Sequence, residues 1–475
     1  MSDLVRFDAL DLSRLIRTRE VTCVEVMTAY LDHIDAHNPR VNAIVALRTR
    51  DDLLAEAAER DRDLDAGRYR GWMHGLPHAV KDLASAAGLP WTNGTPIYAD
   101  RIAEEDDAFV ARIRAAGAII IGKTNVPEFG LGSQSYNSVY GTTRNPYDTS
   151  RTAGGSSGGA GAGLALRMLP VADGGDYMGS LRNPAAFNNV YGLRPSYGRV
   201  PGPGFVAQLS VLGPMGRTID DVAALLEVMA GPDDGSPLSQ HADPAALAPP
   251  IAPRDLRGAR LAWVGDWDGH LATEPGVLDL CRDACAVFEG LGARVDAVSP
   301  PFPPGRLWDM FLTWRWWANL SRYDLYRDPA LRERLKPEVR WEIEHGLKVT
   351  ALDITQAMAE RDAWYATVIA MFGTYDYILA PSAQVFPFSA TTHWPAEIAG
   401  RPMDTYHRWM ETVAPWSLTG LPALGMPAGF GPAGLPTGIT LVGRPFGEHD
   451  VLAAAKAYEQ ATQLVRDNPP PLPEA

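Results

Sequence analysis

Short apolar runs of strand length alternate with longer stretches of helical character over most of this chain. From residue 75 onward the apolar runs are separated by Gly, Pro and Asn, which is the pattern of buried strands between turns. Such runs occupy Leu76–Val80, Ala118–Ile121 and Leu261–Val264, and helical stretches include 105–115, 218–230 and 274–291. The alternation predicts an α/β fold with a large mixed, mostly parallel central sheet that is covered by helices on both faces.

Composition divides the chain into segments without suggesting a second domain. Residues 8–65 are amphipathic and helical, and Thr22 with Glu25 forms a capping-box pattern at the start of one helix. The stretch 231–256 is rich in Pro, Asp and Ala, which indicates a surface connection. We therefore expect one domain over 1–475, made of an N-terminal helical arm at 8–65, a first core segment at 66–230, the connection at 231–256, the remaining core with substrate-pocket insertions at 257–465, and a Pro-rich tail at 466–475.

The charge of the chain excludes several classes of partner. The 475 residues carry a formal net charge of −14, whereas nucleic acid and anionic membranes are bound by clustered positive surfaces. The start of the sequence lacks the regions of a signal peptide, and no apolar run reaches the ~18 residues of a membrane span. Cys281 and Cys285 are four residues apart, which is poor geometry for a disulfide, so the three cysteines are expected to be buried thiols in a reducing compartment. We expect a cytoplasmic protein that binds neither nucleic acid nor membrane.

A glycine-rich segment in the middle third departs most from average composition. Residues 154–163 read GGSSGGAGAG, and residues 173–180 read DGGDYMGS. A flexible linker is one interpretation, but the first run is followed at once by LALRML and PVAD, which are typical of a helix and a strand. The glycines match neither a P-loop nor a GxGxxG dinucleotide fingerprint. Residues 154–158 do satisfy GxSxG, the nucleophile elbow that would make Ser156 the nucleophile, yet the preceding 141–153 is typical of a loop and not of the strand that an elbow requires.

The same segment resembles the amidase signature family, and this resemblance covers more of the chain. Family members carry GGSSGG followed by a second serine in a GGSIR-like context. Here GGSSGG occupies 154–159, GSLRNPA occupies 179–185, and Ser156 and Ser180 are 24 positions apart, as in the family. Further matching segments are GLPHAVKD at 75–82, GKTNVPEFG at 122–130, YGTTRNP at 140–146, GLRP at 192–195, GPMGRT at 213–218 and LPTGITLVGR at 435–444. The resemblance runs from about residue 8 to 465, and the family includes aryl-amidases and carbamate hydrolases.

The resemblance implies a Lys–Ser–Ser triad in place of Ser–His–Asp. Lys81 is then the base, Ser156 the bridging serine and Ser180 the nucleophile that forms an acyl-enzyme. A serine hydroxyl needs a base within hydrogen-bond reach, and a lysine can act as that base only when it is neutral, which burial favours. Lys81 follows two apolar residues on an expected core strand. The alternative for Lys81 is a structural pair with Asp82, and Lys123 is expected to be structural.

The resemblance also assigns the supporting parts of the site. The bridging serine would follow a cis peptide bond between Gly155 and Ser156. The backbone N–H groups that stabilise the oxyanion would be those of Tyr177, Met178, Gly179 and Ser180. The residues that support the loop would be Ser157, Asp176 and Arg182. Met178 stands where the family usually has glycine, so we expect a narrowed or reshaped acyl pocket.

An aromatic segment at 307–326 bears on the substrate. It reads LWDMFLTWRWWANLSRYDLY, in which Leu307, Phe311 and Trp314 share one helical face. The segment is either a buried packing helix or a wall of the substrate pocket. The candidate pocket residues are Tyr136, Phe311, Trp314 and Trp317, with Tyr177 and Met178 as further apolar walls. Together they predict a small uncharged hydrophobic substrate, which is an aryl or alkyl amide or a carbamate.

The remaining expectations concern metals and partners. The proposed mechanism needs no cofactor and no metal. His33 and His37 are four residues apart on one helix, and we expect a solvated face there in preference to a metal pair. The same signature is found in the glutaminase-type subunit of tRNA-dependent amidotransferases, which works with an obligate partner. This subunit is the alternative to a stand-alone hydrolase. The 307–326 segment and Met178 favour the stand-alone hydrolase. The sequence is compatible with a homodimer and leaves the oligomeric state open.

Overall fold

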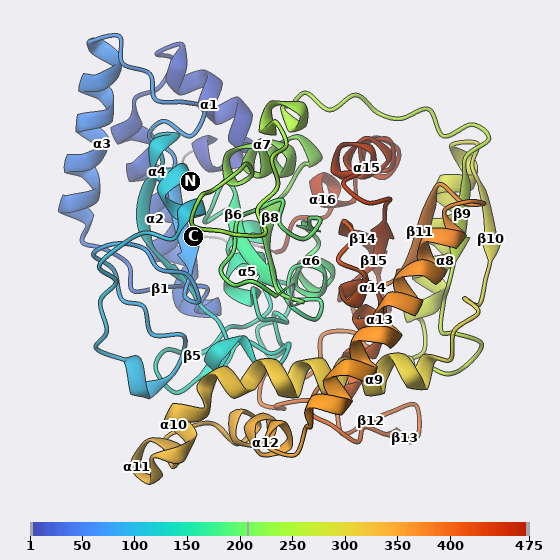
Figure 1. The fold of residues 1–475 in the computed structure, drawn as a ribbon. Coiled ribbons are helices and arrows are strands. Elements are labelled where there is room, and N and C mark those ends of the chain that lie inside the picture. Colours follow the sequence, from blue (N-terminus) through green and yellow to red (C-terminus); the bar gives the residue numbers. More distant parts are fainter. Residues whose placement is uncertain (1–2, 207–208, 472–475) are drawn as a thin grey trace.

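The computed structural model describes residues 3–206 and 209–471, so residues 472–475 of the expected Pro-rich tail lie outside the described residues. Its largest sheet has eight strands in the order β10–β9–β11–β15–β14–β7–β8–β6 (Figure 1). Their bounds are β6 Ala172–Asp176, β7 Tyr191–Arg194, β8 Val211–Gly216, β9 Arg260–Trp263, β10 Arg294–Ala297, β11 Tyr377–Pro381, β14 Ala423–Phe430 and β15 Pro436–Val442. Because both expected core segments contribute strands to this one sheet, we propose that they form a single domain.

The strand directions correct one part of the fold prediction. The sheet is mixed, as predicted, but among the described strands only the pairs β10–β9 and β9–β11 are parallel. All the other neighbouring pairs are antiparallel. One reason is that β14 and β15 form a hairpin across residues 431–435, and a short turn can join only antiparallel strands. The hairpin lies between β11 and β7, so parallel pairing is confined to one end of the sheet.

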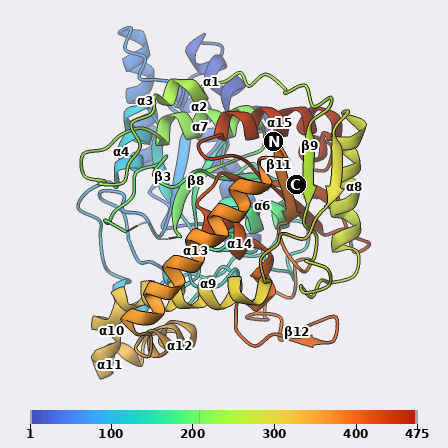
Figure 2. The same ribbon diagram turned by 45° about the vertical axis from the view of Figure 1, so that its right-hand side comes forward.

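Helices cover both faces of the large sheet, as Figures 1 and 2 show. Side chains of a strand point alternately to its two faces, and β11 illustrates the consequence. Tyr377 and Leu379 belong to one hydrophobic cluster, whereas Ile378 and Ala380 belong to another. The first cluster includes residues of α7 Ile219–Met229, α8 Val277–Gly290 and α15 Glu448–Thr462. The second includes residues of α6 Arg182–Asn188, α9 Pro304–Asn319, α13 Ala351–Met371 and α14 Ala414–Thr419.

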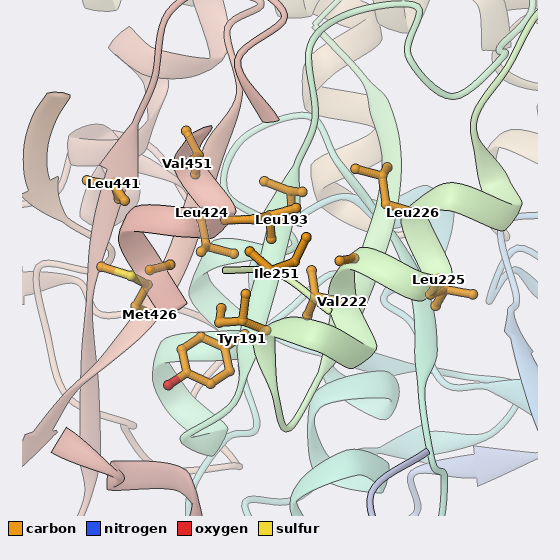
Figure 3. Packing of buried hydrophobic residues seen from close by; sticks show 14 of the residues in the cluster. Tyr191, Leu193, Val222, Leu225, Leu226, Ile251, Leu424, Met426, Leu441 and Val451 are labelled. Carbon is orange, nitrogen blue, oxygen red and sulfur yellow. The ribbon is translucent and has the colours of Figure 1, made fainter. Parts of the chain in front are cut away.

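Figure 3 shows the first of these clusters from close by. Leu193 of β7 lies there beside Leu424 of β14 and Ile251, with Val222 of α7 nearby. Ile251 belongs to the stretch 231–256, whose described structure contains no α-helix or strand and only one short 3-10 turn, at Pro244–Leu247. This stretch also anchors apolar side chains in the core, namely Leu247, Ile251 and Leu256.

The N-terminal arm is helical, as predicted. Its helices are α1 Ala9–Arg17, α2 Cys23–Val41 and α3 Arg50–Asp65, and α2 begins with the Thr22–Glu25 capping box. The expectation of a solvated face at His33 and His37 was wrong, because both side chains are buried. His33 Nε2 lies 2.6 Å from the carbonyl oxygen of Leu166, which caps the C-terminal end of the helix Gly158–Ala165 that the glycine-rich run forms.

A second, smaller sheet lies between the N-terminal arm and the large sheet. Its strands are β1 Ile44–Val45, β3 Ile119–Thr124 and β2 Pro77–Lys81, in that spatial order. Every residue of β2 and β3 is buried, as the apolar runs predicted. Strand β2 packs beside β6 of the large sheet and ends at Lys81. The two sheets therefore meet where the candidate base lies.

The remaining α-helices and strands are short or lie at the periphery. They are α4 Ala108–Ala115, α5 Gly158–Ala165, α10 Tyr323–Arg327, α11 Pro329–Arg332, α12 Pro337–Gly346, α16 Leu464–Asp467, β4 Tyr136–Asn137, β5 Gly141–Thr142, β12 Glu397–Ile398 and β13 Arg401–Pro402. Further 3-10 helices occupy η1 Asp3–Arg6, η2 Pro96–Tyr98, η3 Glu128–Gly130 and η6 Arg408–Val413. The three cysteines are buried and free. Within 3–206 and 209–471, no helix combines the length and the apolar character that a bilayer span requires.

Candidate active site

Lys81 Nζ, at the end of β2, is surrounded by oxygen atoms of the glycine-rich segments. It lies 2.8 Å from Ser156 Oγ, 2.7 Å from Ser157 Oγ and 3.1 Å from the carbonyl oxygen of Gly175. The lysine side chain is only 2% exposed. The structure thus brings the predicted base and the predicted bridging serine into direct contact. Sequence reasoning missed the contacts of Lys81 with Ser157 and Gly175.

The surroundings of Lys81 favour its neutral form. Burial lowers the pKa of Lys81 to about 7, although the negative charges of Asp173 and Asp176 oppose this fall. The alternative pair with Asp82 does not occur, because the Asp82 carboxylate lies 4.0 Å from Lys123 Nζ instead. Lys123 is buried in that pair, which agrees with a structural role. A lysine with a pKa near neutrality is able to accept a proton under physiological conditions.

The glycine-rich run is ordered structure and not a linker. Ser156 and Ser157 directly precede α5, and the peptide bond before Ser156 is cis, as the resemblance implied. Glycine is required in α5 because the helix packs closely on neighbouring backbone, where a Cβ on Gly159 would lie 2.5 Å from the carbonyl oxygen of Ala43. The residues before Ser156 form no extended strand, so the local structure lacks the strand that precedes a nucleophile elbow.

The loop that follows β6 is built around a buried carboxylate. Asp176 accepts hydrogen bonds from the backbone N–H groups of Gly179 at 2.7 Å and Leu181 at 3.2 Å. Arg182 binds both carboxylate oxygens at 3.0 Å, and Arg194 Nη1 lies 3.5 Å from one of them. Burial raises the pKa of Asp176, but the two guanidinium groups and the hydrogen bonds outweigh it and hold this pKa below its usual range.

Arg182 also ties this loop to the last third of the chain. Its Nη1 donates to the carbonyl oxygen of Val413 at 3.2 Å, and its Nη2 donates to Ser417 Oγ at 2.7 Å. Arg194 donates to the carbonyl oxygen of Ser417 at 3.1 Å. Asp176 and Arg182 thus make the contacts that a loop-supporting role requires.

The predicted set of oxyanion donors needs one correction. The N–H of Gly179 is occupied by the Asp176 carboxylate, because this carboxylate folds back over the loop that follows it. Within the described residues, the backbone N–H groups of Tyr177, Met178 and Ser180 have no protein acceptor. These three groups remain available to a ligand.

Ser180 lies beside the serines that contact Lys81. Its carbonyl oxygen accepts a hydrogen bond from the N–H of Ser157 at 3.3 Å. The Ser180 side chain is 6% exposed, and in the described parts of the chain no hydrogen bond joins its hydroxyl to that of Ser156. The structure therefore brings the two segments together but does not display a completed relay.

Met178 points into the protein core and not into a pocket. Its side chain is buried in the cluster that contains Met410 and Val413. The next residue, Gly179, has a φ of +82°, and a Cβ there would lie 2.7 Å from Val413 Cγ2. The expected narrowing of the acyl pocket by Met178 is not what the structure shows, because this side chain is buried in the core and does not line the cavity at Lys81.

A cavity of about 840 Å³ opens at Lys81 and Ser156. Tyr177 contributes to its wall, as predicted, and so do Phe129 and Leu131. The η5 turn at Leu320–Arg322, which directly follows α9, forms a further part of the wall. The volume is that of an ordinary small-molecule site.

The four other predicted pocket residues do not line this cavity. Phe311 and Trp314 are buried in the aromatic core, and Trp317 packs edge-on against Trp314 with ring centroids 5.3 Å apart. Tyr136 stacks on His393 at 4.4 Å and donates to Glu338 at 2.9 Å. The packing-helix interpretation of 307–326 therefore accounts for its tryptophans, because α9 is covered by α12, α13 and α14.

Sequence reasoning also missed a buried group behind Lys81. Asp173 accepts a hydrogen bond from the backbone N–H of Lys81 at 3.2 Å and lies 3.0 Å from His78 Nε2. The Asp173 and His78 side chains are fully buried, and they link β2 to β6. The only signal in the sequence was the acidic residue that opens the DGGD stretch, whose partner in space could not be inferred.

Known proteins resemble this chain over nearly its whole length. The sequence profile described as Amidase matches residues 25–452. An acylamidase of Rhodococcus erythropolis is 33% identical over 95% of this chain and 94% of its own length. One component of the glutamyl-tRNA(Gln) amidotransferase of Thermus thermophilus is 36% identical over 95% of this chain and 97% of its own length. The crystal structure of a bacterial aryl acylamidase of the amidase signature family superimposes with a TM-score of 0.90 at 26% identity, covering 98% of this chain and 99% of that one.

Proposed function

Because the chain belongs to the amidase signature family and is thus a hydrolase of carbon–nitrogen bonds, we propose that it cleaves small amides through an acyl-enzyme on Ser180. Lys81 is the base in this proposal, and Ser156 is the bridging serine. One observation carries it above all others: Lys81 is buried, has a pKa of about 7 and lies 2.8 Å from Ser156 Oγ. A basic lysine in contact with a serine hydroxyl is the arrangement that serine activation requires.

Proton transfer in this mechanism passes through the bridging serine. Neutral Lys81 takes the proton of Ser156 while Ser156 takes the proton of Ser180, once the Ser180 hydroxyl has turned toward it. Ser180 Oγ attacks the carbonyl carbon, and the π electrons of the C=O bond move to oxygen. Collapse of the tetrahedral intermediate breaks the C–N bond, and the leaving amine takes a proton returned from Lys81 through Ser156. Water then hydrolyses the acyl ester by the same route.

The negative oxygen of the intermediate needs donors that are already in place. We assign this role to the backbone N–H groups of Tyr177, Met178 and Ser180, which have no acceptor among the described residues. Asp176 supports the assignment, because its bonds to Gly179 and Leu181 fix the loop on either side of Ser180. The donors are therefore held before substrate arrives.

The substrate we propose is a small hydrophobic aryl or alkyl amide, or a carbamate. The cavity volume of about 840 Å³ suits such a molecule. A solved relative is an aryl acylamidase, and a curated relative is an acylamidase, which supports the amide over the carbamate. The test is hydrolysis of p-nitroanilides in parallel with p-nitrophenyl carbamates by the purified chain.

A second candidate function is that of a glutaminase-type subunit. It is favoured by the relatives that are components of glutamyl-tRNA(Gln) amidotransferases, one of which is 36% identical to this chain. The two functions are separated by assaying the isolated chain with glutamine and with an aryl amide. Turnover of the aryl amide without glutaminase activity supports the stand-alone hydrolase, and the reverse result supports the amidotransferase component.

A fluorophosphonate identifies the nucleophile directly. We expect the label on Ser180, and trypsin separates the candidates, because Ser156 lies on the peptide that ends at Arg167 and Ser180 on the one that ends at Arg182. A Ser156→Ala variant should be labelled more slowly but still at Ser180, since Ser156 passes a proton and does not attack carbon. Label on the Arg167 peptide would overturn the proposed triad.

A further inference from the structure

The wall of the cavity carries seven charged side chains, and each of them has a polar partner within the protein. Six of these pairs lie outside the η5 turn. These are Lys81 with Ser156, Asp106 with Arg114, Asp107 with the N–H of Ser85, Asp173 with His78, Asp233 with Arg112, and Arg315 with Glu342. The seventh is Arg322, at the end of the η5 turn. In the described part of the chain, no carboxylate lies within 4.0 Å of its guanidinium group.

Arg322 is held in place although it lacks a counter-ion among the described residues. Its Nη1 donates to Asn319 Oδ1 at 2.6 Å, and its guanidinium carbon lies 5.0 Å from the centre of the Phe129 ring. The hydrogen bond and the cation–π contact fix the plane of the group. A guanidinium group has five N–H donors and the described structure uses only one, so four donors remain available to a ligand in the cavity that Arg322 lines.

The electrostatic surroundings make an anion the favoured ligand. Burial lowers the pKa of Arg322, and the nearby positive charge of Arg315 acts in the same direction, whereas the negative charge of Glu342 acts against them. An arginine nevertheless remains charged at physiological pH, so this site contains a partly desolvated cation that no described carboxylate contacts. Arg315 does not offer a second such site, because it already forms an ion pair with the Glu342 carboxylate at 2.5 Å and donates to Tyr406 Oη at 2.6 Å.

Arg322 lies in the same cavity as the proposed base Lys81 and the proposed bridging serine Ser156. The cavity that opens at Lys81 and Ser156 includes Arg322 and Asn319 in its wall. The charge of Arg322 also acts on Tyr177, which begins the loop that carries Ser180. Ser180 is not part of this wall, but Tyr177 of its loop is, so a ligand that reaches Ser180 through this cavity also has access to the guanidinium group.

We infer that Arg322 binds a carboxylate of the substrate, so that the preferred substrates are amides with an anionic group on the acyl or the amine side. The inference rests on the proposed function and replaces the uncharged substrate that the aromatic segment alone predicted. Asn319 and Phe129 position the guanidinium group, and the hydrophobic part of the substrate lies between it and the reacting carbonyl.

The test measures equilibrium binding to a Ser180→Ala variant, which keeps ligands intact. Two matched pairs differ only in charge: 4-acetamidobenzoate against 4-acetamidobenzamide, and N-phenylsuccinamate against N-phenylsuccinamide. The carboxylate lies on the amine side in the first pair and on the acyl side in the second. In at least one pair we expect the carboxylate to bind about ten- to a hundredfold more tightly than the neutral amide, as for other hydrogen bonds to charged groups.

Arg322→Gln in the Ser180→Ala background should reduce this ratio to about one, and Arg322→Lys should retain part of it through charge alone. The control is Arg306→Gln, which removes an exposed arginine of α9 that is paired with Glu360 outside the cavity. It should keep the ratio of the parent. Three results would each overturn the inference. They are a ratio near one in the parent, a ratio that Arg322→Gln does not change, and no binding of either carboxylate at millimolar concentration.

Wild-type turnover of neutral p-nitroacetanilide is measured separately and bears on the proposed function alone. If the enzyme hydrolyses this amide while the carboxylates show no advantage, the hydrolase proposal stands and the Arg322 inference falls. If no amide is hydrolysed but the carboxylates bind through Arg322, the hydrolase proposal falls and the carboxylate site at Arg322 stands.

Discussion

Replacing Lys81 by Met tests whether the proposed base is neutral in the folded protein. Methionine keeps an unbranched side chain of similar length but removes the ionisable group. In the folded state the pKa of Lys81 is about 7, and its ordinary value is 10.5. At pH values between 7 and 10.5 the unfolded chain binds more protons than the folded chain. The destabilisation that Lys81 causes is therefore complete below pH 7, decreases as the pH rises, and is absent above pH 10.5. Wild-type stability therefore gains from this residue as the pH rises through that window.

The size of the effect follows from the two pKa values. One pKa unit corresponds to about 1.4 kcal/mol, so burying Lys81 costs roughly 4 kcal/mol at pH 7 and roughly 2 kcal/mol at pH 9. The Met variant also loses the hydrogen bonds to Ser156 and Ser157, whose contribution of about 1 kcal/mol each does not depend on the Lys81 titration. The pH dependence of the difference between the two proteins therefore isolates the charge.

The assay is urea unfolding of both proteins at pH 7 and pH 9, followed by tryptophan fluorescence. We expect the free energy of unfolding of Lys81→Met, relative to wild type, to fall by about 2 kcal/mol between pH 7 and pH 9. Lys348→Met, which removes an exposed lysine, is the control and should show no such change. If the difference between Lys81→Met and wild type is the same at both pH values, Lys81 stays protonated in the folded protein and cannot be the base.

Further predictions concern activity. The kcat/KM for an amide should fall about tenfold per pH unit below pH 7, because Lys81 becomes protonated there; a flat profile down to pH 5 would exclude it as the base. Lys81→Ala should lower kcat by several orders of magnitude, whereas Lys123→Ala should act mainly on the unfolding midpoint, and the reverse order with folded proteins would refute the assignment. Gly179→Ala should lower kcat at least tenfold, because the new Cβ meets Val413. The control Gly258→Ala has a similar positive φ but lies in open space, so it should cost about 1 kcal/mol of stability and leave kcat unchanged. Equal kcat values for the two variants would show that the loop tolerates displacement. EDTA should leave the rate unchanged, since the described residues contain no cluster suited to a metal, and a loss that zinc restores would contradict the serine mechanism.

The sequence predicted those features whose causes are local. Apolar runs identified β2 and β3 because a strand buried on both faces must be continuously hydrophobic. The serines and Lys81 were found through the resemblance, and the structure places Lys81 and Ser156 2.8 Å apart. The strand directions were not predictable, because the position of the β14–β15 hairpin depends on contacts between residues far apart in the sequence.

The errors in the candidate site have the same origin. Helical spacing showed that Phe311 and Trp314 share a face, but not whether a cavity or α13 and α14 would cover that face. The N–H of Gly179 was expected to be free because nothing in the local sequence indicates that the Asp176 side chain turns back onto it. Arg322 was overlooked because its distinguishing property, the lack of a neighbouring carboxylate among the described residues, exists only in three dimensions.

The place of β14 and β15 in the large sheet has a consequence for synthesis of the chain. These strands end at residue 442, yet they lie between β11 on one side and β7 on the other. Until the ribosome has released them, the growing polypeptide can form only two half-sheets, each with an edge of unpaired backbone groups that is open to foreign strands. Val413 and Ser417, which anchor Arg182, also emerge late. A polypeptide truncated before this region would therefore be both inactive and prone to aggregation, so the chain must be synthesised through residue 442 before the hydrolase exists.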